Sequence, residues 1–252
     1  MIKVTGVCHL YNEEYLLPYW IDHHKKIFDD IIFIDYASTD QSVNIIKNLI
    51  PNANIIPSRN SEFSAKDCDT EVIELEWATP GHKIALNITE FLVGNVRKMI
   101  ATNDFVQYLM PAYPMVDSIT TEFTELEFPN ESLVAQRMNG INIERGEQFF
   151  NIRKARSLHV TVPYYPTGRH YTKYNTDDCV ILWYGYSPFN EDTIKRKLQI
   201  QTRIPDFDRQ QEKGIEHFVT RDQLIYNFRY YQQHAEDLTE FLYPKLEDTY
   251  NG

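Results

Sequence analysis

The sequence predicts an α/β fold built on parallel strands. Over the first 57 residues, short apolar runs alternate with segments of helical periodicity, and this alternation is typical of strand-helix-strand units. Ligands of such folds bind in a crevice beyond the carboxyl ends of the strands. The chain has 252 residues, enough for one domain with a substantial core. We expect strands at 4–8, 31–34 and 54–56, and helices at 18–28 and 42–50.

The later elements follow from similar signals. A short apolar strand over 83–88 ends in polar residues, where a strand delivers functional groups to a crevice. Residues 190–201 and 221–242 have helical patterns, the first with acidic residues at its start and basic residues further along. The chain therefore reads as a single domain over 1–252 with a helical C-terminal flank.

Composition limits the class of partner. With 25 Lys and Arg against 36 Asp and Glu, the net charge is −11, and this field repels nucleic acid backbones and anionic lipid surfaces. We therefore expect no nucleic acid partner. The 17 tyrosines and 14 phenylalanines make an aromatic excess that suits sugar rings or protein partners.

The chain carries no sequence signal for export or membrane insertion. Its first seven residues read as a strand rather than a signal peptide, and no segment reaches the roughly 18 to 20 apolar residues that a membrane span requires. Its cysteines, Cys8, Cys68 and Cys179, are few, odd in number and scattered, which fits reduced thiols better than a disulfide framework. We expect a cytoplasmic protein.

Two motifs follow successive predicted strands. The first contains Asn12-Glu13 and a helix ending in His23-His24, and the second is Asp35-x-x-Ser38-x-Asp40. Together they resemble the family 2-like glycosyltransferases of GT-A fold, most clearly over residues 4–50. The resemblance implies a Rossmann-like mixed sheet flanked by helices, with a nucleotide-binding half over 1–94 and an acceptor-side half with the C-terminal helices over 95–252. It also implies hexosyl or pentosyl transfer from a nucleoside-diphosphate sugar, such as a UDP- or GDP-sugar, to a glycan or other hydroxyl acceptor. No glycine lies between Cys8 and Glu14, which argues against a methyltransferase-like nucleotide site.

These motif residues are the candidate nucleotide contacts. Asp35, at the end of a buried strand, can accept hydrogen bonds from a ribose hydroxyl or a base edge. Ser38 and Asp40 begin the following helix, and for Asp40 an ordinary N-cap role is the alternative. Asn12 and Glu13 also follow a strand end, where the alternative is a turn with a solvated carboxylate.

The metal motif implied by the resemblance is altered. GT-A enzymes typically hold a divalent metal with an Asp-x-Asp motif, whereas the corresponding stretch here is Asn87-Ile88-Thr89-Glu90. Only Glu90 supplies an anionic oxygen for Mg²⁺ or Mn²⁺, with Asn87 as a neutral ligand. Three alternatives stay open: Glu90 acts with a distant partner, the enzyme is metal-independent, or the chain is a catalytically silent nucleotide- or glycan-binding module.

The distant partner of Glu90 is predicted to be a histidine. The resemblance implies a late histidine on the metal or diphosphate, and a neutral imidazole is a competent ligand for Mn²⁺. His217 is the first candidate, with His170 and His159 as substitutes, and simple exposure is its alternative. His23 and His24 read as structural residues at a helix end.

Because the chain is so acidic, it can stabilise a leaving diphosphate only where basic residues lie close together. Lys195, Arg196 and Lys197 form the densest basic cluster, for which a solvated helix face is the alternative. Arg59 is a second candidate for the base or phosphates. The aromatic run over 183–189 offers surfaces for stacking an acceptor sugar.

An inverting transfer also needs a general base near the acceptor hydroxyl. The candidate carboxylates are Asp117, Glu144 and Glu147, and their positions do not choose among them. A retaining enzyme would not need that base in the same place, so the stereochemistry stays open.

Overall fold

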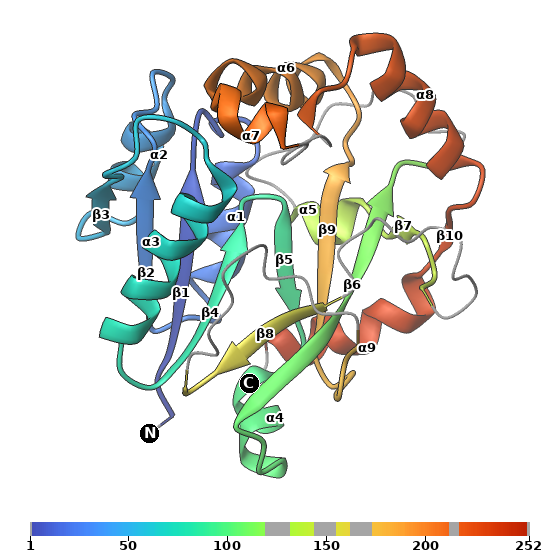
Figure 1. Ribbon diagram of the computed structural model, residues 1–252. Helices are drawn as coiled ribbons and strands as arrows, with labels where there is room; N and C mark the ends of the chain where they lie inside the picture. Colours follow the sequence, from blue (N-terminus) through green and yellow to red (C-terminus); the bar gives the residue numbers. More distant parts are fainter. Residues whose placement is uncertain (1, 119–131, 144–154, 162–172, 212–216, 251–252) are drawn as a thin grey trace.

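The computed structural model describes residues 2–118, 132–143, 155–161, 173–211 and 217–250. A twisted sheet with strand order β10-β7-β6-β8-β4-β1-β2-β3 crosses the molecule (Figure 1). Its parallel part consists of β3, β2, β1 and β4. The strands are β1 Val4–Leu10, β2 Asp30–Asp35, β3 Asn54–Pro57, β4 His82–Asn87, β6 Gln107–Val116, β7 Asn139–Gly140, β8 Ala155–His159 and β10 Glu236–Asp237.

Antiparallel pairs extend this parallel part. Strand β8 runs antiparallel to both β4 and β6. Strand β9 (Val180–Tyr186) lies parallel to β6 and antiparallel to β5 (Glu90–Val93), so β5 and β9 leave the main path of the sheet. The mixed α/β sheet that the resemblance implies is confirmed.

Helices cover both faces of the parallel strands. Helix α1 (Leu17–His24) and helix α2 (Ser42–Leu49) contribute Trp20 and Ile46 to the core that contains Cys8 and Phe33. Helix α3 (Ala65–Ala78) packs on the opposite face, where its Cys68 and Val72 contact Val7 and Ile34. Burial on both faces explains why β1 and β2 are almost continuously apolar.

The predicted helical C-terminal flank is confirmed. Figure 1 shows α6 and α7 above the carboxyl end of β1. Within the described ranges no helix has both the length and the apolar character needed to cross a membrane. The remaining elements are α4 Val96–Thr102, α5 Leu133–Gln136, α6 Glu191–Gln199, the 3₁₀ helix η2 Ile200–Arg203, α7 Asp206–Gln210, α8 Arg221–Gln232 and α9 Thr239–Tyr250.

Two helix predictions need correction, and one helix was not predicted. The helix expected over 18–28 ends at His24, because the chain then turns so that the backbone N–H of Asp29 can bond Val4. The helix expected over 221–242 is wrong as one element: α8 stops at Gln232, the chain pairs as β10 with β7, and α9 follows. Helix α3 was not predicted, because Glu71 and Glu76 occupy two of its buried positions and interrupt the apolar pattern.

Two adjacent histidines join α1 to β5. The His23 Nε2 lies 2.7 Å from the Leu92 carbonyl oxygen, and the Leu92 N–H donates to His24 Nε2 at 3.2 Å. The Tyr250 hydroxyl lies 2.8 Å from His23 Nδ1. Burial lowers the pKa of His23 to about 4, so both contacts belong to a neutral ring. This agrees with the structural role expected for the pair.

Candidate functional site

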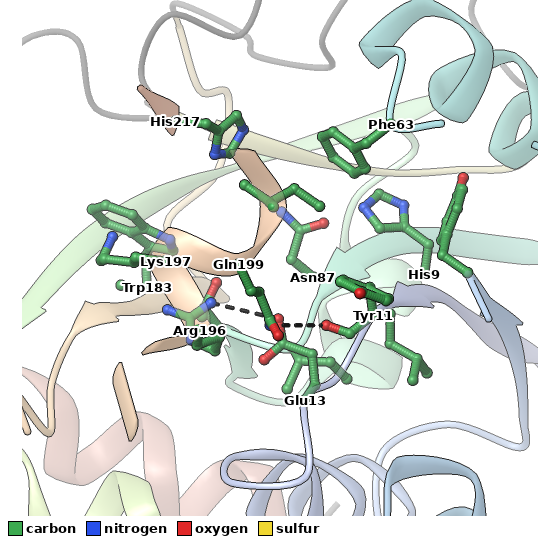
Figure 2. Close-up of a pocket in the computed structure, with 16 residues that line it drawn as sticks. His9, Tyr11, Glu13, Phe63, Asn87, Trp183, Arg196, Lys197, Gln199 and His217 are labelled. Atoms are coloured by element: carbon green, nitrogen blue, oxygen red, sulfur yellow. Dashed lines mark hydrogen bonds and ion pairs between the residues drawn. The ribbon is translucent and has the colours of Figure 1, made fainter. Parts of the chain in front are cut away.

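A cavity of about 190 Å³ lies at the carboxyl ends of β1 and β4, between these strands and α6 (Figure 2). Figure 2 shows Trp183, Arg196 and Lys197 on one side, with His9, Tyr11 and Phe63 facing them. The full lining consists of His9, Leu10, Tyr11, Glu13, Tyr36, Phe63, Asn87, Ile88, Thr89, Trp183, Gly185, Arg196, Lys197, Gln199, Ile200 and His217.

Helix α6 is fastened to the strand ends by its last residue. The Gln199 side-chain amide donates to the backbone oxygens of Tyr11 and Asn12, at 3.2 and 3.1 Å. Because the first of these oxygens belongs to a cavity residue, α6 cannot shift without disturbing the cavity wall. The C-terminal flank is therefore part of the site.

Arg203 makes a second connection between the flank and the cavity walls. Its guanidinium donates to the Tyr36 carbonyl oxygen and, at 3.0 Å, to that of Ser61, and it lies 4.3 Å from the centre of the Tyr11 ring. The Phe63 N–H donates in return to the Arg203 carbonyl oxygen at 2.7 Å. This set of contacts closes the cavity on the side of η2.

Glu13 places a carboxylate in the cavity. One oxygen lies 3.5 Å from the Arg196 guanidinium, while Oε2 is buried and has no hydrogen-bond partner among the described residues. Burial raises the pKa of Glu13, and the nearby charges of Arg196 and Lys197 oppose that rise. Glu13 is therefore held in the cavity wall by one cation, Arg196.

On the opposite wall of the cavity, a lysine ammonium lies over two aromatic rings. The Lys197 ammonium lies 4.0 Å from the centre of the Tyr186 ring and 5.5 Å from that of Trp183. A side chain at Gly185 would place its Cβ 2.1 Å from the Trp183 ring, so the glycine lets the indole lie against the backbone. The Trp183 indole is thus packed into the cavity wall.

The two sequence motifs bond mainly to each other. The backbone N–H of Asn12 donates to Ser38 Oγ at 3.0 Å, and Asp35 accepts from the Ser38 N–H at 3.0 Å. The Asp40 carboxylate accepts from the Ser42 N–H at 2.9 Å, near the start of α2. Asn12, Asp35, Ser38 and Asp40 stand next to the cavity without lining it, and their contact with a nucleotide stays a prediction.

Glu90 differs most from its expected placement. Its side chain is fully buried, with Oε1 2.8 Å from Nε and 2.7 Å from Nη2 of Arg156, and its Oε2 accepts from the Asn87 N–H at 2.8 Å. Glu90 begins β5 and lies behind the cavity wall instead of in it. Asn87 and His217, the other predicted ligands, do line the cavity.

The described residues do not fit the predicted Mg²⁺ or Mn²⁺. Such ions prefer carboxylate oxygens, and both oxygens of Glu90 already accept from the protein. Across the described ranges, no three His, Cys, Asp or Glu side chains form a group that could hold a metal ion. His159, a substitute ligand in the prediction, is buried with its Nε2 3.6 Å from Glu76, away from the cavity lining.

Two of the predicted cations lie outside the cavity. Lys195 is exposed on α6, because successive helical residues point about 100° apart and Lys197 takes the cavity side. Arg59 is exposed and forms an ion pair with Glu74 at 2.5 Å. Of the basic cluster, Arg196 and Lys197 face the cavity.

Of the three predicted general bases, Asp117 lies within the described residues, and it does not line the cavity. Asp117 is buried and accepts from the Ser187 hydroxyl at 2.5 Å and the Phe189 N–H at 2.8 Å, so it holds the turn after β9. Burial raises the pKa of Asp117. Glu144, Glu147 and His170 lie outside the described residues.

Several cavity residues were not predicted. Tyr11 and Tyr36 stand beside the named motif residues at positions that the motifs leave open, and Phe63 and Gln199 belong to no motif. Loops bring Tyr11, Tyr36 and Phe63 to the cavity from different strand ends. For Gln199 the sequence signal is its distance from Arg196: it follows by three residues, a spacing that places two side chains on one helix face.

A larger hollow, of about 810 Å³, lies at the other end of the parallel strands. Its basic side chains are neutralised in exposed pairs, Lys3 with Asp30 at 2.6 Å and Lys25 with Asp22 at 2.8 Å. Because parallel sheets bind ligands at the carboxyl ends of their strands, the smaller cavity is the candidate site.

Comparisons with known proteins concern the fold. No protein-family model and no curated protein matches the chain. Among solved structures, TarS 1–349 of S. aureus is 12% identical with a TM-score of 0.36, over 52% of this chain and 40% of that one. Glucosyl-3-phosphoglycerate synthase from Mycobacterium tuberculosis, in complex with Mn²⁺, UDP and glucosyl-3-phosphoglycerate, is 16% identical with a TM-score of 0.34, over 45% and 44%. The chain thus covers less than half the length of either structure.

Proposed function

We propose that the chain is a glycosyltransferase that binds a nucleoside-diphosphate sugar in the cavity and transfers the sugar to a hydroxyl acceptor. One observation carries the proposal: in a chain of net charge −11, Arg196 and Lys197 of α6 meet aromatic walls at the carboxyl ends of β1 and β4. Cations suit a diphosphate, and aromatic faces suit a base or a sugar ring.

The charge of the cavity supports this choice of ligand. Glu13 is the one carboxylate among the described lining residues, against the two cations of Arg196 and Lys197, so with neutral histidines the lining has a net charge of +1. A positive pocket in an acidic protein concentrates anions locally. As the donor's bond to the sugar breaks, negative charge grows on the leaving diphosphate, and these fixed cations stabilise it.

The size of the cavity bears on how the donor enters. Its volume of about 190 Å³ is below the roughly 300–1,000 Å³ of typical small-molecule sites. A donor of that class therefore extends beyond the cavity, on whose border the contacts of Gln199 and Arg203 lie.

A catalytically silent nucleotide- or glycan-binding module is the second candidate. The observation that favours it is Glu90, the one acidic residue of the altered motif, which is bound to Arg156 behind the cavity wall. Such a module would bind UDP or GDP and release no product from their sugars.

The test measures release of nucleoside diphosphate from a panel of UDP- and GDP-sugars, with and without Mn²⁺, beside calorimetric binding of the same compounds. Trp183→Ala removes a cavity wall and should lower both binding and release. Trp77→Ala is the matched control, since Trp77 is 55% exposed on α3 and does not line the cavity. Binding without release supports the module, and the absence of both refutes the proposal.

A further inference from the structure

We infer that the cavity binds the diphosphate of its donor through Arg196 and Lys197 without a divalent metal; the inference rests on the function proposed above. It concerns how charge is neutralised: a bound diphosphate needs positive charge from a metal, from side chains or from both. Two features of the structure bear on this choice: the state of the carboxylate that a metal would need, and the side-chain cations that could replace the metal.

The carboxylate is already neutralised from within the protein. Glu90 and Arg156 are 0% and 6% exposed, and two guanidinium nitrogens lie within 2.8 Å of one carboxylate oxygen. Recruiting Glu90 to a metal would separate a buried ion pair and leave Arg156 as an unpaired buried charge, which is strongly unfavourable. The pair therefore keeps Glu90 out of the cavity.

The side-chain cations are built into the site. The Arg196 side chain is 13% exposed, and its buried Nε has no hydrogen-bond partner among the described residues. Lys197 approaches from the same helix, with its ammonium over the Tyr186 and Trp183 rings, 4.0 and 5.5 Å from their centres. The positions of Arg196 and Lys197 do not depend on Glu90, so no metal ion is needed to place these two cations at the cavity.

The experiment is calorimetric titration of the full chain with UDP and with GDP, first in EDTA and then in excess Mn²⁺. We expect the tighter-binding nucleotide to have the same dissociation constant, within about twofold, under both conditions. Lys197→Met keeps the length of the side chain and removes one charge-assisted contact, so binding in EDTA should weaken about tenfold or more. Lys197→Arg restores the charge and should recover most of the affinity.

Lys47→Met, at an exposed position on α2, controls for the loss of one positive charge and should bind like the parent. Thermal melting of each variant shows that it is folded. Binding that appears only with Mn²⁺ overturns this inference and leaves the proposed function standing. No binding of either nucleotide under either condition refutes the proposed function itself. Equal affinity of the parent and Lys197→Met also overturns the inference.

Discussion

The guanidinium of Arg156 on β8 holds the carboxylate of Glu90 on β5, with nitrogen-oxygen distances of 2.7 and 2.8 Å and both side chains buried. The same carboxylate accepts from the backbone of Asn87, at the end of β4. The pair therefore joins three strands directly behind the candidate site.

Glu90→Gln should destabilise the protein. The substitution leaves the Arg156 charge buried and unpaired, at a cost of about 3–5 kcal/mol in the free energy of unfolding. Urea denaturation measures this loss. Glu74→Gln makes the same chemical change in the exposed pair with Arg59, and its effect should be much smaller. Similar losses in the two variants would show that burial does not set the strength of the Glu90 pair.

Arg203→Met should loosen the cover of the cavity. It removes charge-assisted hydrogen bonds to the carbonyl oxygens of Tyr36 and Ser61. Faster amide hydrogen exchange is expected at Phe63, whose N–H bonds the Arg203 carbonyl oxygen. Arg209→Met is the control, since Arg209 bonds the carbonyl oxygens of Ile204 and Gln201 on its own side of the cavity. Unchanged exchange at Phe63 in Arg203→Met would count against the closing role of Arg203.

Acid should destabilise the protein through His23. Its folded pKa of about 4 lies below the ordinary value of 6.5, so the unfolded chain binds the extra proton first. The contribution of His23 to the free energy of unfolding, about 3 kcal/mol, is fully present above pH 6.5 and is lost as the pH drops toward 4. Urea denaturation across this range measures the slope.

His23→Gln should flatten that dependence on pH. His24, whose pKa is also lowered by burial, keeps a share of it. In contrast, His234→Gln changes an exposed position and should leave the acid sensitivity in place. A slope equal to the parent's in His23→Gln would refute the assignment.

Gly185→Ala should displace the Trp183 indole, because the new Cβ would lie 2.1 Å from the ring. Overpacking of this kind costs about 1–3 kcal/mol, and tryptophan fluorescence should shift as the ring moves. The loss should shrink in a Trp183→Leu background, where the ring is absent. A double-mutant cycle measures this coupling, and purely additive losses would rule out the contact.

The first half of the fold was predictable because its signals are local. The apolar runs that form β1, β2 and β3 and the periodicity of α2 can each be read within about ten residues. Helix α3 was missed for the opposite reason. Its buried Glu71 is satisfied by partners outside the helix, among them the Ser58 hydroxyl at 2.7 Å and the Arg59 N–H at 2.9 Å.

The site was predictable in part. Glu13, Asn87, Lys197 and His217 were named from sequence and line one cavity. Asp35, Ser38 and Asp40 were named from the same motif, yet Ser38 and Asp40 accept from the backbone N–H groups of Asn12 and Glu14 in the preceding loop, and Asp35 accepts from the Ser38 N–H within its own loop. A motif identifies the end of the strand, and hydrogen bonding between loops decides which side chains are left to face a ligand.

By itself the sequence determined the α/β class, the helical flank and the loss of carboxylates in Asn87–Glu90, because composition and periodicity are properties of neighbouring residues. Only the tertiary structure decided that Glu90 is held by Arg156, which lies 66 residues away, and that Arg196 and Lys197 bring positive charge to the cavity. The physical reason is that a buried charge must find its counter-charge in space, and strand pairing sets which distant residue supplies it.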